Sequence, residues 1–236
     1  MAIDKEIENE IENLKYKGWV RTFKPSQKLE KCIKRVKSPN QKYIFNAFNN
    51  LTPKTTKVFI LGQDPYPQKG RAHGYAFSFG DNKKPAEDSL LNIYKAIQKA
   101  YNPQNDINTW NTNLASWAKT YGVLLLNTAL THEKDTKTTI NKHIKAWKPF
   151  IEDVINNLLT CNSTKLVVFL WGDKAKSIFF NYTKGTKISR DILVLISNHP
   201  SNLSVNHGGN FPILVPNHFK ACNDFLGKDA IKWDDI

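Results

Sequence analysis

Cysteine is scarce in this chain of 236 residues, and its spacing excludes several kinds of protein. The three cysteines, Cys32, Cys161 and Cys222, are odd in number, and no two of them lie close together in the sequence. A disulfide framework, a cysteine-based zinc site and a four-cysteine iron–sulfur cluster need more cysteines or closer spacing. We therefore expect buried free thiols in a reducing compartment.

Long apolar runs are missing as well. No stretch approaches the ~20 apolar residues of a membrane span, and segment 1–17 is too charged for a secretory signal peptide. These absences predict a soluble, cytoplasmic protein. A nuclear or virus-encoded protein would have the same features.

Sequence motifs for metals and nucleotide cofactors are also absent. His73, His199, His207 and His218 form no HxxxH or HxH pair, which is the spacing that metal-binding histidines commonly have. The sequence contains neither a Walker loop nor a GxGxxG motif. We expect no metal ion and no cofactor.

What the chain does contain is an excess of positive charge. Its 34 lysines and arginines outnumber 21 acidic residues, giving a net charge of +13 and a pI near 9.5. Such an excess favours a polyanionic partner such as DNA or RNA. Asparagine and lysine are abundant along the whole chain, so a biased genome composition would produce the same excess, and charge alone leaves both interpretations open.

Short runs of branched aliphatic residues predict buried strands. They cover residues 58–61, 123–126, 166–170 and 192–196. Each run is continuously apolar rather than alternating, which favours burial on both faces, as in a parallel sheet.

Apolar residues at helical spacing predict helices before, between and after these runs. The predicted helices cover residues 4–14, 26–36, 89–101, 151–159, 173–180 and 217–226. Because strands and helices alternate, the expected fold class is α/β. We expect a single domain over residues 1–236, a three-layer α/β/α sandwich around a four-stranded, mostly parallel sheet.

A polar segment directly follows each predicted strand. In a parallel sheet the carboxyl ends of the strands share one edge, and ligands bind there. The sequence therefore predicts that this edge gathers Gln63, Asp64, Tyr66, Asn127, Asp173, His199, Ser201 and Ser204.

Three of these residues offer catalytic or recognition chemistry. Asp64 lies in a loop stiffened by Pro65 and Pro67, which suits a preorganised carboxylate. The Asn127 amide can both donate to and accept from the edge of a base, and His199 can act as an acid, a base or an electrophile. Each also has a structural interpretation, as a tight turn, a strand-end cap or an isolated loop histidine.

Five motifs, in order along the chain, resemble those of the family 1 uracil-DNA glycosylases. Segments 62–66 (GQDPY) and 199–204 (HPSNLS) resemble the two signature loops of that family, and segment 124–128 (LLLNT) resembles its middle motif. Segments 72–78 (AHGYAFS) and 89–95 (SLLNIYK) also match the family pattern. The resemblance extends from about Trp19 to Leu226, and five ordered motifs are far more specific than a lone glycine motif.

This resemblance implies an enzyme that flips uracil out of DNA and hydrolyses its N-glycosidic bond, leaving an abasic site and initiating base-excision repair. Asp64 would activate or position water and stabilise the cationic charge on the sugar. His199, as a neutral imidazole, would donate a hydrogen bond to uracil O2. No lysine is recognisable as a nucleophile, so the enzyme would be a monofunctional hydrolase that needs no metal.

The resemblance also assigns a uracil pocket. Asn127 would bind the O4 and N3–H edge and reject cytosine, and Tyr66 would crowd C5 and exclude thymine. Phe77 would stack on the flipped base, and Gln63 would contribute mainly through its backbone near O2. Considered alone, Phe77 would be interpreted as a core residue and Tyr66 as a turn residue.

DNA contacts are implied for a further group of residues. Leu203 would enter the base stack where uracil left and offset part of the unstacking cost. Ser89, Ser201 and Ser204 would contact phosphates near the lesion, with Pro85 shaping its loop. The expected partners are uracil-containing DNA, single- or double-stranded, and an acidic DNA-mimicking inhibitor protein, and the chain is expected to be a monomer.

The sequence departs from the family pattern at several places. Pro67 stands where the family usually has histidine, so the phosphate-side contact of that histidine is lost. Asn202 replaces the proline before the wedge, which favours a less rigid loop. Asp173 replaces a small phosphate-contacting residue, and it would point away, cap the next helix or weaken the grip on DNA. Segments 85–88 and 205–211 differ as well.

Two alternatives remain beside a uracil-specific enzyme. The first is a relative with broadened base specificity, against which Tyr66 and Asn127 argue. The second is a DNA-binding module in which catalysis is secondary, such as a replication accessory factor. Pro67 and Asp173 keep that alternative open, and the presence of the expected catalytic residues opposes it.

Overall fold

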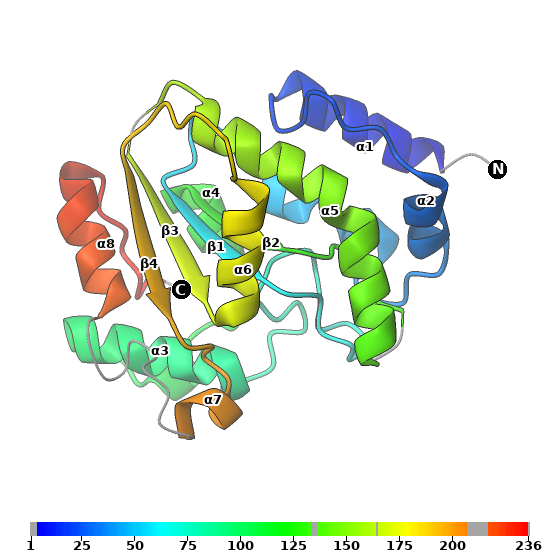
Figure 1. Cartoon of the computed structure of the whole chain (residues 1–236). Coiled ribbons are helices and arrows are strands. Elements are labelled where there is room, and N and C mark those ends of the chain that lie inside the picture. Colours follow the sequence, from blue (N-terminus) through cyan, green and yellow to red (C-terminus); the bar gives the residue numbers. More distant parts are fainter. Residues whose placement is uncertain (1–3, 134–135, 164, 207–216, 236) are drawn as a thin grey trace.

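The chain folds around a four-stranded sheet in a computed structural model that describes residues 4–133, 136–163, 165–206 and 217–235 (Figure 1). The strands are β1 (Val58–Gly62), β2 (Val123–Asn127), β3 (Leu166–Trp171) and β4 (Ile192–Ser197). Their order across the sheet is β2-β1-β3-β4, and the pairs β1–β2, β1–β3 and β3–β4 are all parallel. The predicted strands are confirmed to within one residue.

Burial differs among the strands. Every residue of β1, β2 and β3 is buried, as the continuous apolar runs predicted. The prediction is wrong for β4, which borders the sheet beyond β3 and is mostly half-buried, with Ile196 43% exposed. Edge position alone does not cause this exposure, because β2 lies at the other edge and is fully buried; the elements packed around β4 leave its apolar residues partly open to solvent.

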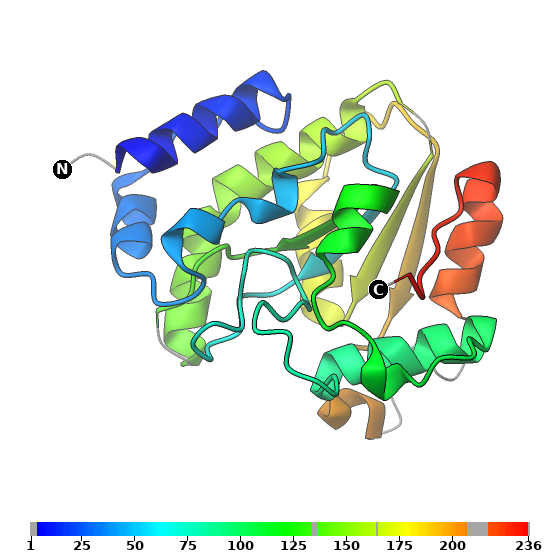
Figure 2. The same ribbon diagram turned by 180° about the vertical axis from the view of Figure 1, so that it is seen from behind.

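Helices form two layers around the sheet. The helices are α1 (Lys5–Tyr16), α2 (Gln27–Lys34), α3 (Asp88–Tyr101), α4 (Ala115–Tyr121), α5 (Lys137–Thr160), α6 (Asp173–Tyr182), α7 (Asn202–Asn206) and α8 (His218–Leu226). Helices α5 and α6 cover one face of the sheet, and α4 and α8 cover the other (Figures 1 and 2). The predicted α/β/α layering is confirmed, with α3 and α7 lying at the carboxyl end of the strands.

Side-chain caps explain where several helices begin. Asp4, Ser26 and Asn217 each accept a hydrogen bond from a backbone N–H of the first helical turn, so α1, α2 and α8 start one residue after the predicted boundary. A cap residue lies outside the hydrogen-bonded helix. The predicted and observed starts of these helices therefore differ only in whether the cap residue is counted.

Helix α5 is the largest correction to the predicted elements. It extends over Lys137–Thr160, although the apolar spacing predicted only residues 151–159. Pro149 lies inside the helix and removes one backbone hydrogen bond. The turns before Pro149 bury His143, Ala146 and Trp147, and this packing stabilises a helix that the sequence pattern alone does not indicate.

The amino edge of the sheet is held by Arg190, a buried residue two positions before β4. Its guanidinium donates at 2.9–3.3 Å to the backbone carbonyl oxygens of Pro53, Thr56, Leu158 and Lys165. It also donates to the Sγ of Cys161, which is buried and free, as are Cys32 and Cys222. The predicted free thiols are therefore confirmed. Within the described ranges, no helix is long and apolar enough to cross a bilayer.

Candidate active site

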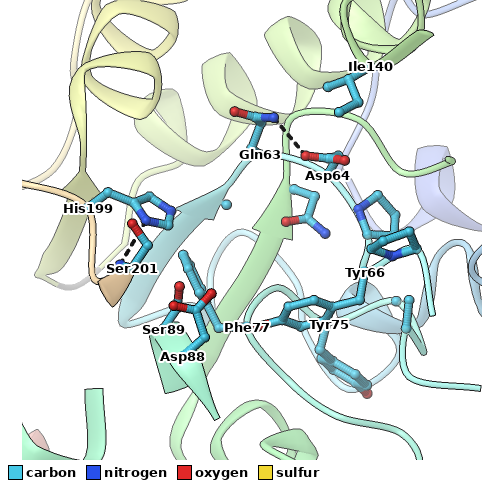
Figure 3. Close-up of a pocket in the computed structure, with 16 residues that line it drawn as sticks. Gln63, Asp64, Tyr66, Tyr75, Phe77, Asp88, Ser89, Ile140, His199 and Ser201 are labelled. Carbon is cyan, nitrogen blue, oxygen red and sulfur yellow. Dashed lines mark hydrogen bonds between the residues drawn. The ribbon is translucent and has the colours of Figure 1, made fainter. Parts of the chain in front are cut away.

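The loops at the carboxyl edge of the sheet surround a cavity of about 320 Å³ (Figure 3). Six of the residues predicted to gather at this edge line it: Gln63, Asp64, Tyr66, Asn127, His199 and Ser201. Phe77, from the loop between β1 and α3, and Ser89, from the first turn of α3, line it too. Segments that are far apart in the sequence thus form one site.

The other predicted site residues lie outside this cavity. Asp173 and Leu203 line a neighbouring hollow of about 510 Å³, which shares His199 and Ser201 with the first. Ser204 is half-buried on α7, and Pro85 is exposed in the loop before α3. The structure does not bring these four residues into the cavity.

Asp64 is held from two directions. The Nε2 of Gln63 donates to one carboxylate oxygen at 2.8 Å, and the Nδ1 of His132 lies 3.2 Å from the other. The Nζ of Lys174 in turn donates to the Oε1 of Gln63 at 2.7 Å. Gln63 was expected to contribute mainly through its backbone. Its side chain instead links the Lys174 ammonium group to the Asp64 carboxylate.

His199 has a defined tautomer. The backbone N–H of Ser201 donates to its Nδ1 at 3.1 Å, so in the neutral imidazole the proton is on Nε2. Burial lowers the pKa of His199 below its ordinary value, and the nearby Asp88 carboxylate opposes that shift. At neutral pH the ring is thus an uncharged donor beside the cavity.

Aromatic rings form walls of the cavity, Phe77 and Tyr66 among them. Phe77 has a positive φ of 63°, uncommon for a bulky residue, and its ring centroid lies 6.0 Å from that of His199 and 5.6 Å from that of Trp171. The Tyr66 ring contacts Phe79 edge-on at 5.2 Å. Burial raises the pKa of Tyr66, so its phenol stays protonated.

Asn127 ends β2 opposite Gly62, its partner in the strand register. A Cβ added at Gly62 would lie 2.2 Å from the Oδ1 of Asn127, so the amide lies across the bare glycine backbone. The amide makes no hydrogen bond to another described residue, and it lines the cavity. Both its donor and its acceptor are therefore available to a ligand.

Helix α7 is anchored where the sequence predicted a less rigid loop. The buried Asn92 donates through Nδ2 to the carbonyl oxygen of Pro200 at 2.7 Å and to the Oδ1 of Asn202 at 2.9 Å. The backbone N–H of Asn202 donates to the Oδ1 of Asp88 at 3.0 Å. These bonds hold the segment whose Leu203 is 74% exposed.

Two further departures can be located. Asp173 is the first residue of α6 and the N-cap is Gly172, so Asp173 does not occupy the capping position. Pro67 lines the cavity and offers no side-chain hydrogen bond there. Of segment 205–211, residues 207–211 lie outside the described residues.

In the part of the chain that is described, no three His, Cys, Asp or Glu side chains group so as to hold a metal ion.

Known proteins resemble this chain over most of its length. A profile described as the uracil DNA glycosylase superfamily matches residues 48–227. The chain belongs to the uracil-DNA glycosylase superfamily. The uracil-DNA glycosylase of Psychromonas ingrahamii is 37% identical over 92% of each chain, and that of Borreliella burgdorferi (strain ZS7) is 39% identical over 80% of this chain and 78% of its own.

Solved structures in this superfamily share the fold. The crystal structure of mimivirus uracil-DNA glycosylase matches 98% of this chain and 86% of its own, with a TM-score of 0.71 and 26% identity. A variant of that mimivirus protein, solved in complex with UGI, matches with a TM-score of 0.72.

Sequence reasoning missed three residues of this superfamily member: His132, Asn92 and Lys174. His132 and Lys174 contact the predicted site residues Asp64 and Gln63, and Asn92 contacts the segment that carries Ser201 and Leu203, each from an element that is distant in the sequence. Two of them carried a signal: His132 is a histidine five residues after Asn127 on the segment leaving β2, and Asn92 lies inside the matched segment 89–95, although no role was assigned to it. Nothing in the sequence distinguishes Lys174 from an ordinary helix residue.

Proposed function

We propose that this chain is an active family 1 uracil-DNA glycosylase, one monofunctional domain that hydrolyses the bond between uracil and deoxyribose without a metal ion. One observation carries the proposal: a single cavity has a carboxylate on one side and a neutral imidazole donor on the other. The reaction needs both, because charge of opposite sign develops on the sugar and on the base.

The chemistry follows from these two groups. As the C1′–N1 bond breaks, its electron pair leaves with N1, so the uracil becomes anionic and the sugar becomes cationic. The Nε2–H of His199 donates to O2, where negative charge grows, and the Asp64 carboxylate stabilises the cation. Water then adds to C1′, and Asp64 accepts its proton.

Base selection is assigned to the walls of the cavity. The unpartnered Asn127 amide matches the O4 and N3–H edge of uracil, which cytosine does not present. The protonated Tyr66 ring fills the space where the C5 methyl group of thymine would lie, and Phe77 supplies a face for stacking. The backbone of Gln63 contributes near O2.

DNA binding is assigned to the rim. The exposed Leu203 fills the gap that the flipped base leaves, and Ser89, Ser201 and Ser204 contact phosphates, with Pro85 shaping its loop. The net charge of +13 supplies attraction that salt screens. An acidic inhibitor protein that mimics DNA would bind the same rim, and the mimivirus complex with UGI supports this partner by analogy.

The test is release of free uracil from a uracil-containing oligonucleotide, single- and double-stranded, in EDTA, with thymine and cytosine oligonucleotides as controls. Wild-type protein is expected to release uracil alone. Asp64→Asn is expected to lose at least about 100-fold in rate while still binding DNA. Asp191→Asn, at the opposite edge of the sheet, is the matched control and is expected to keep full activity.

Folded wild-type protein that binds DNA but releases no uracil would contradict the proposal and support a DNA-binding module. Equal release by Asp64→Asn would remove this carboxylate from the mechanism. Loss of release in EDTA, restored by a divalent metal, would contradict a metal-independent reaction.

A further inference from the structure

We infer that His132 is a positioning residue for Asp64, holding the carboxylate in the orientation that the reaction needs. This inference deepens the proposed function and rests on it, because it concerns the same carboxylate. Nothing in the sequence motifs points to His132, which lies in the segment between β2 and α5.

The geometry gives the imidazole one polar contact. The Nδ1 of His132 lies 3.2 Å from the Oδ2 of Asp64. An ionised carboxylate only accepts, so Nδ1 carries the hydrogen and donates it. The His132 side chain is 3% exposed and lies outside the cavity lining, whereas the Asp64 side chain is 16% exposed and lines the cavity. His132 therefore holds the carboxylate from behind.

The backbone of His132 is fixed without help from the imidazole. Its N–H donates to the carbonyl oxygen of Ser38 at 2.8 Å, and its carbonyl oxygen accepts from the N–H groups of Lys37 and Ser38. This short antiparallel bridge positions the segment whatever side chain residue 132 carries. A purely structural role thus gives little reason for a histidine here.

The second ring nitrogen strengthens this point. The Nε2 of His132 is buried and has no hydrogen-bond partner among the described residues. An unpaired buried polar atom lowers stability, and a buried position selected for packing alone is better filled by an apolar residue. The loss of stability from the unpaired Nε2 is explained if the Nδ1 of His132 is needed to orient Asp64.

Both Asp64 oxygens consequently have a donor. Gln63, itself held by Lys174, binds Oδ1, and His132 binds Oδ2, so the carboxylate cannot rotate about its terminal bond without losing a hydrogen bond. Pro67, also in the cavity wall, has no side-chain donor to replace either one. Removing His132 leaves a carboxylate held on one side only.

The experiment compares three variants with the wild type in single-turnover uracil release and in DNA binding. His132→Leu keeps the bulk and removes the donor, and it is expected to lower the rate about 10-fold to 100-fold while leaving DNA affinity unchanged. His132→Asn places an amide N–H near the former Nδ1 and is expected to recover most of that loss. A structural role would not separate these two variants in this way.

His143→Leu is the matched control. His143 is buried in the neighbouring helix and pairs with the Thr131 hydroxyl at 2.8 Å, and it does not contact Asp64. This variant is expected to lose stability and to keep the wild-type rate at temperatures where it is folded. A wild-type rate for His132→Leu, or equal losses in all three variants, would overturn the inference.

A spectroscopic readout separates this inference from the proposed function. The His132 Nδ1–H proton is expected as a low-field NMR resonance that is absent in His132→Leu and moves upfield in Asp64→Asn, because an amide oxygen is a weaker acceptor than a carboxylate. A resonance that Asp64→Asn leaves unchanged would overturn the contact. Wild-type protein without uracil release would contradict the proposed function, and this resonance would still decide whether His132 binds Asp64.

Discussion

At the scale of single residues, the Tyr66 ring can be tested as the group that separates uracil from thymine. These bases differ by one methyl group, and a pocket distinguishes them only if a rigid side chain occupies that space. The ring lies edge-on against Phe79, and the Tyr66 carbonyl oxygen accepts from the hydroxyl of Ser38 at 2.5 Å. Both contacts limit how far Tyr66 can move.

Tyr66→Ala is therefore expected to release thymine measurably from an oligonucleotide while its uracil release falls. Tyr66→Phe keeps the ring, removes only the hydroxyl, and should still reject thymine. The measurement is the ratio of the two release rates for each variant. An unchanged ratio in Tyr66→Ala would assign thymine exclusion to another wall of the cavity.

The residues that sequence reasoning located are those within continuous motifs. Asn127 is the last residue of β2, and Asp64 and His199 lie two residues beyond the ends of β1 and β4, so the parallel topology brings them together. His132 was not predicted, and Asn92 was given no role although it lies in a matched motif, because each acts through a contact with a residue 68 or 110 positions away. Such contacts depend on how the helices and loops pack, which local spacing does not encode.

At the scale of elements, the register between β1 and β2 sets the position of the Asn127 amide. A Cβ at Gly62 would lie 2.2 Å from the Asn127 Oδ1 and 2.8 Å from the Cβ of Ala76, so one of them must move. Gly62→Ala is expected to displace the amide and to lower the rate of uracil release at least about 100-fold.

The control for this substitution is Gly185→Ala. Gly185 has a φ of +82° and open space around it, so alanine there adds backbone strain without touching the site. Melting temperatures and release rates of the two variants separate strain from displacement. A folded Gly62→Ala protein with the wild-type rate would mean that the amide tolerates the shift.

Helix α3 supports α7 through Asn92. Asn92→Ala leaves the Pro200 carbonyl and the Asn202 side chain without their donor, and it is expected to lower the free energy of unfolding by about 1–3 kcal/mol. Because α7 carries Leu203, uracil release from duplex DNA should fall more than release from single strands.

Asn157→Ala is the comparison for that prediction. Asn157 is also buried, and its Nδ2 donates to the Trp19 carbonyl oxygen at 3.2 Å and to Asp153 at 2.9 Å. It should lower stability by a similar amount and affect both substrates equally. Equal losses on duplex and single strands in Asn92→Ala would show that α7 does not need this support.

Element prediction succeeded where local pattern and burial agree. The buried strands are continuous apolar runs, and they were located to within one residue. Helix α5 was predicted only after Pro149, because proline ordinarily marks a boundary. Helix α7 has five residues, too few for an apolar spacing to be visible, and it forms through its contacts with α3.

At the scale of the whole molecule, buried histidines make stability depend on pH. Burial lowers the pKa of His73 and of His218 to about 4, and it also lowers the pKa of His143 and of His199. Between pH 6.5 and about 4 the unfolded chain binds protons that the folded chain does not. Stability is therefore fully present above pH 6.5 and is lost as the pH falls through that window.

His73 and His218 each contribute on the order of 1 kcal/mol per pH unit in this window. Denaturant unfolding from pH 7 to pH 4 measures the slope. The double variant His73→Gln, His218→Asn keeps hydrogen-bonding groups near Ser78 and Trp171 and should flatten it. Carboxylates lose their charge in the same pH range. If stability falls with pH as steeply in the double variant as in the wild type, the carboxylates and not these histidines cause the pH dependence.

The position of Arg190 late in the sequence also affects how the chain folds during its synthesis. Its hydrogen bonds reach Thr56 and Pro53, 134 and 137 positions earlier in the sequence. Until residue 190 has been synthesised, the carbonyl oxygens that accept from the Arg190 guanidinium lack this donor, and β4 is absent from the sheet. During synthesis the sheet therefore consists of β1, β2 and β3 only, and the edge of β3 that β4 will cover is exposed. We therefore expect a nascent chain that stalls before residue 190 to bind chaperones and to be cleaved by proteases more readily than a chain that contains β4.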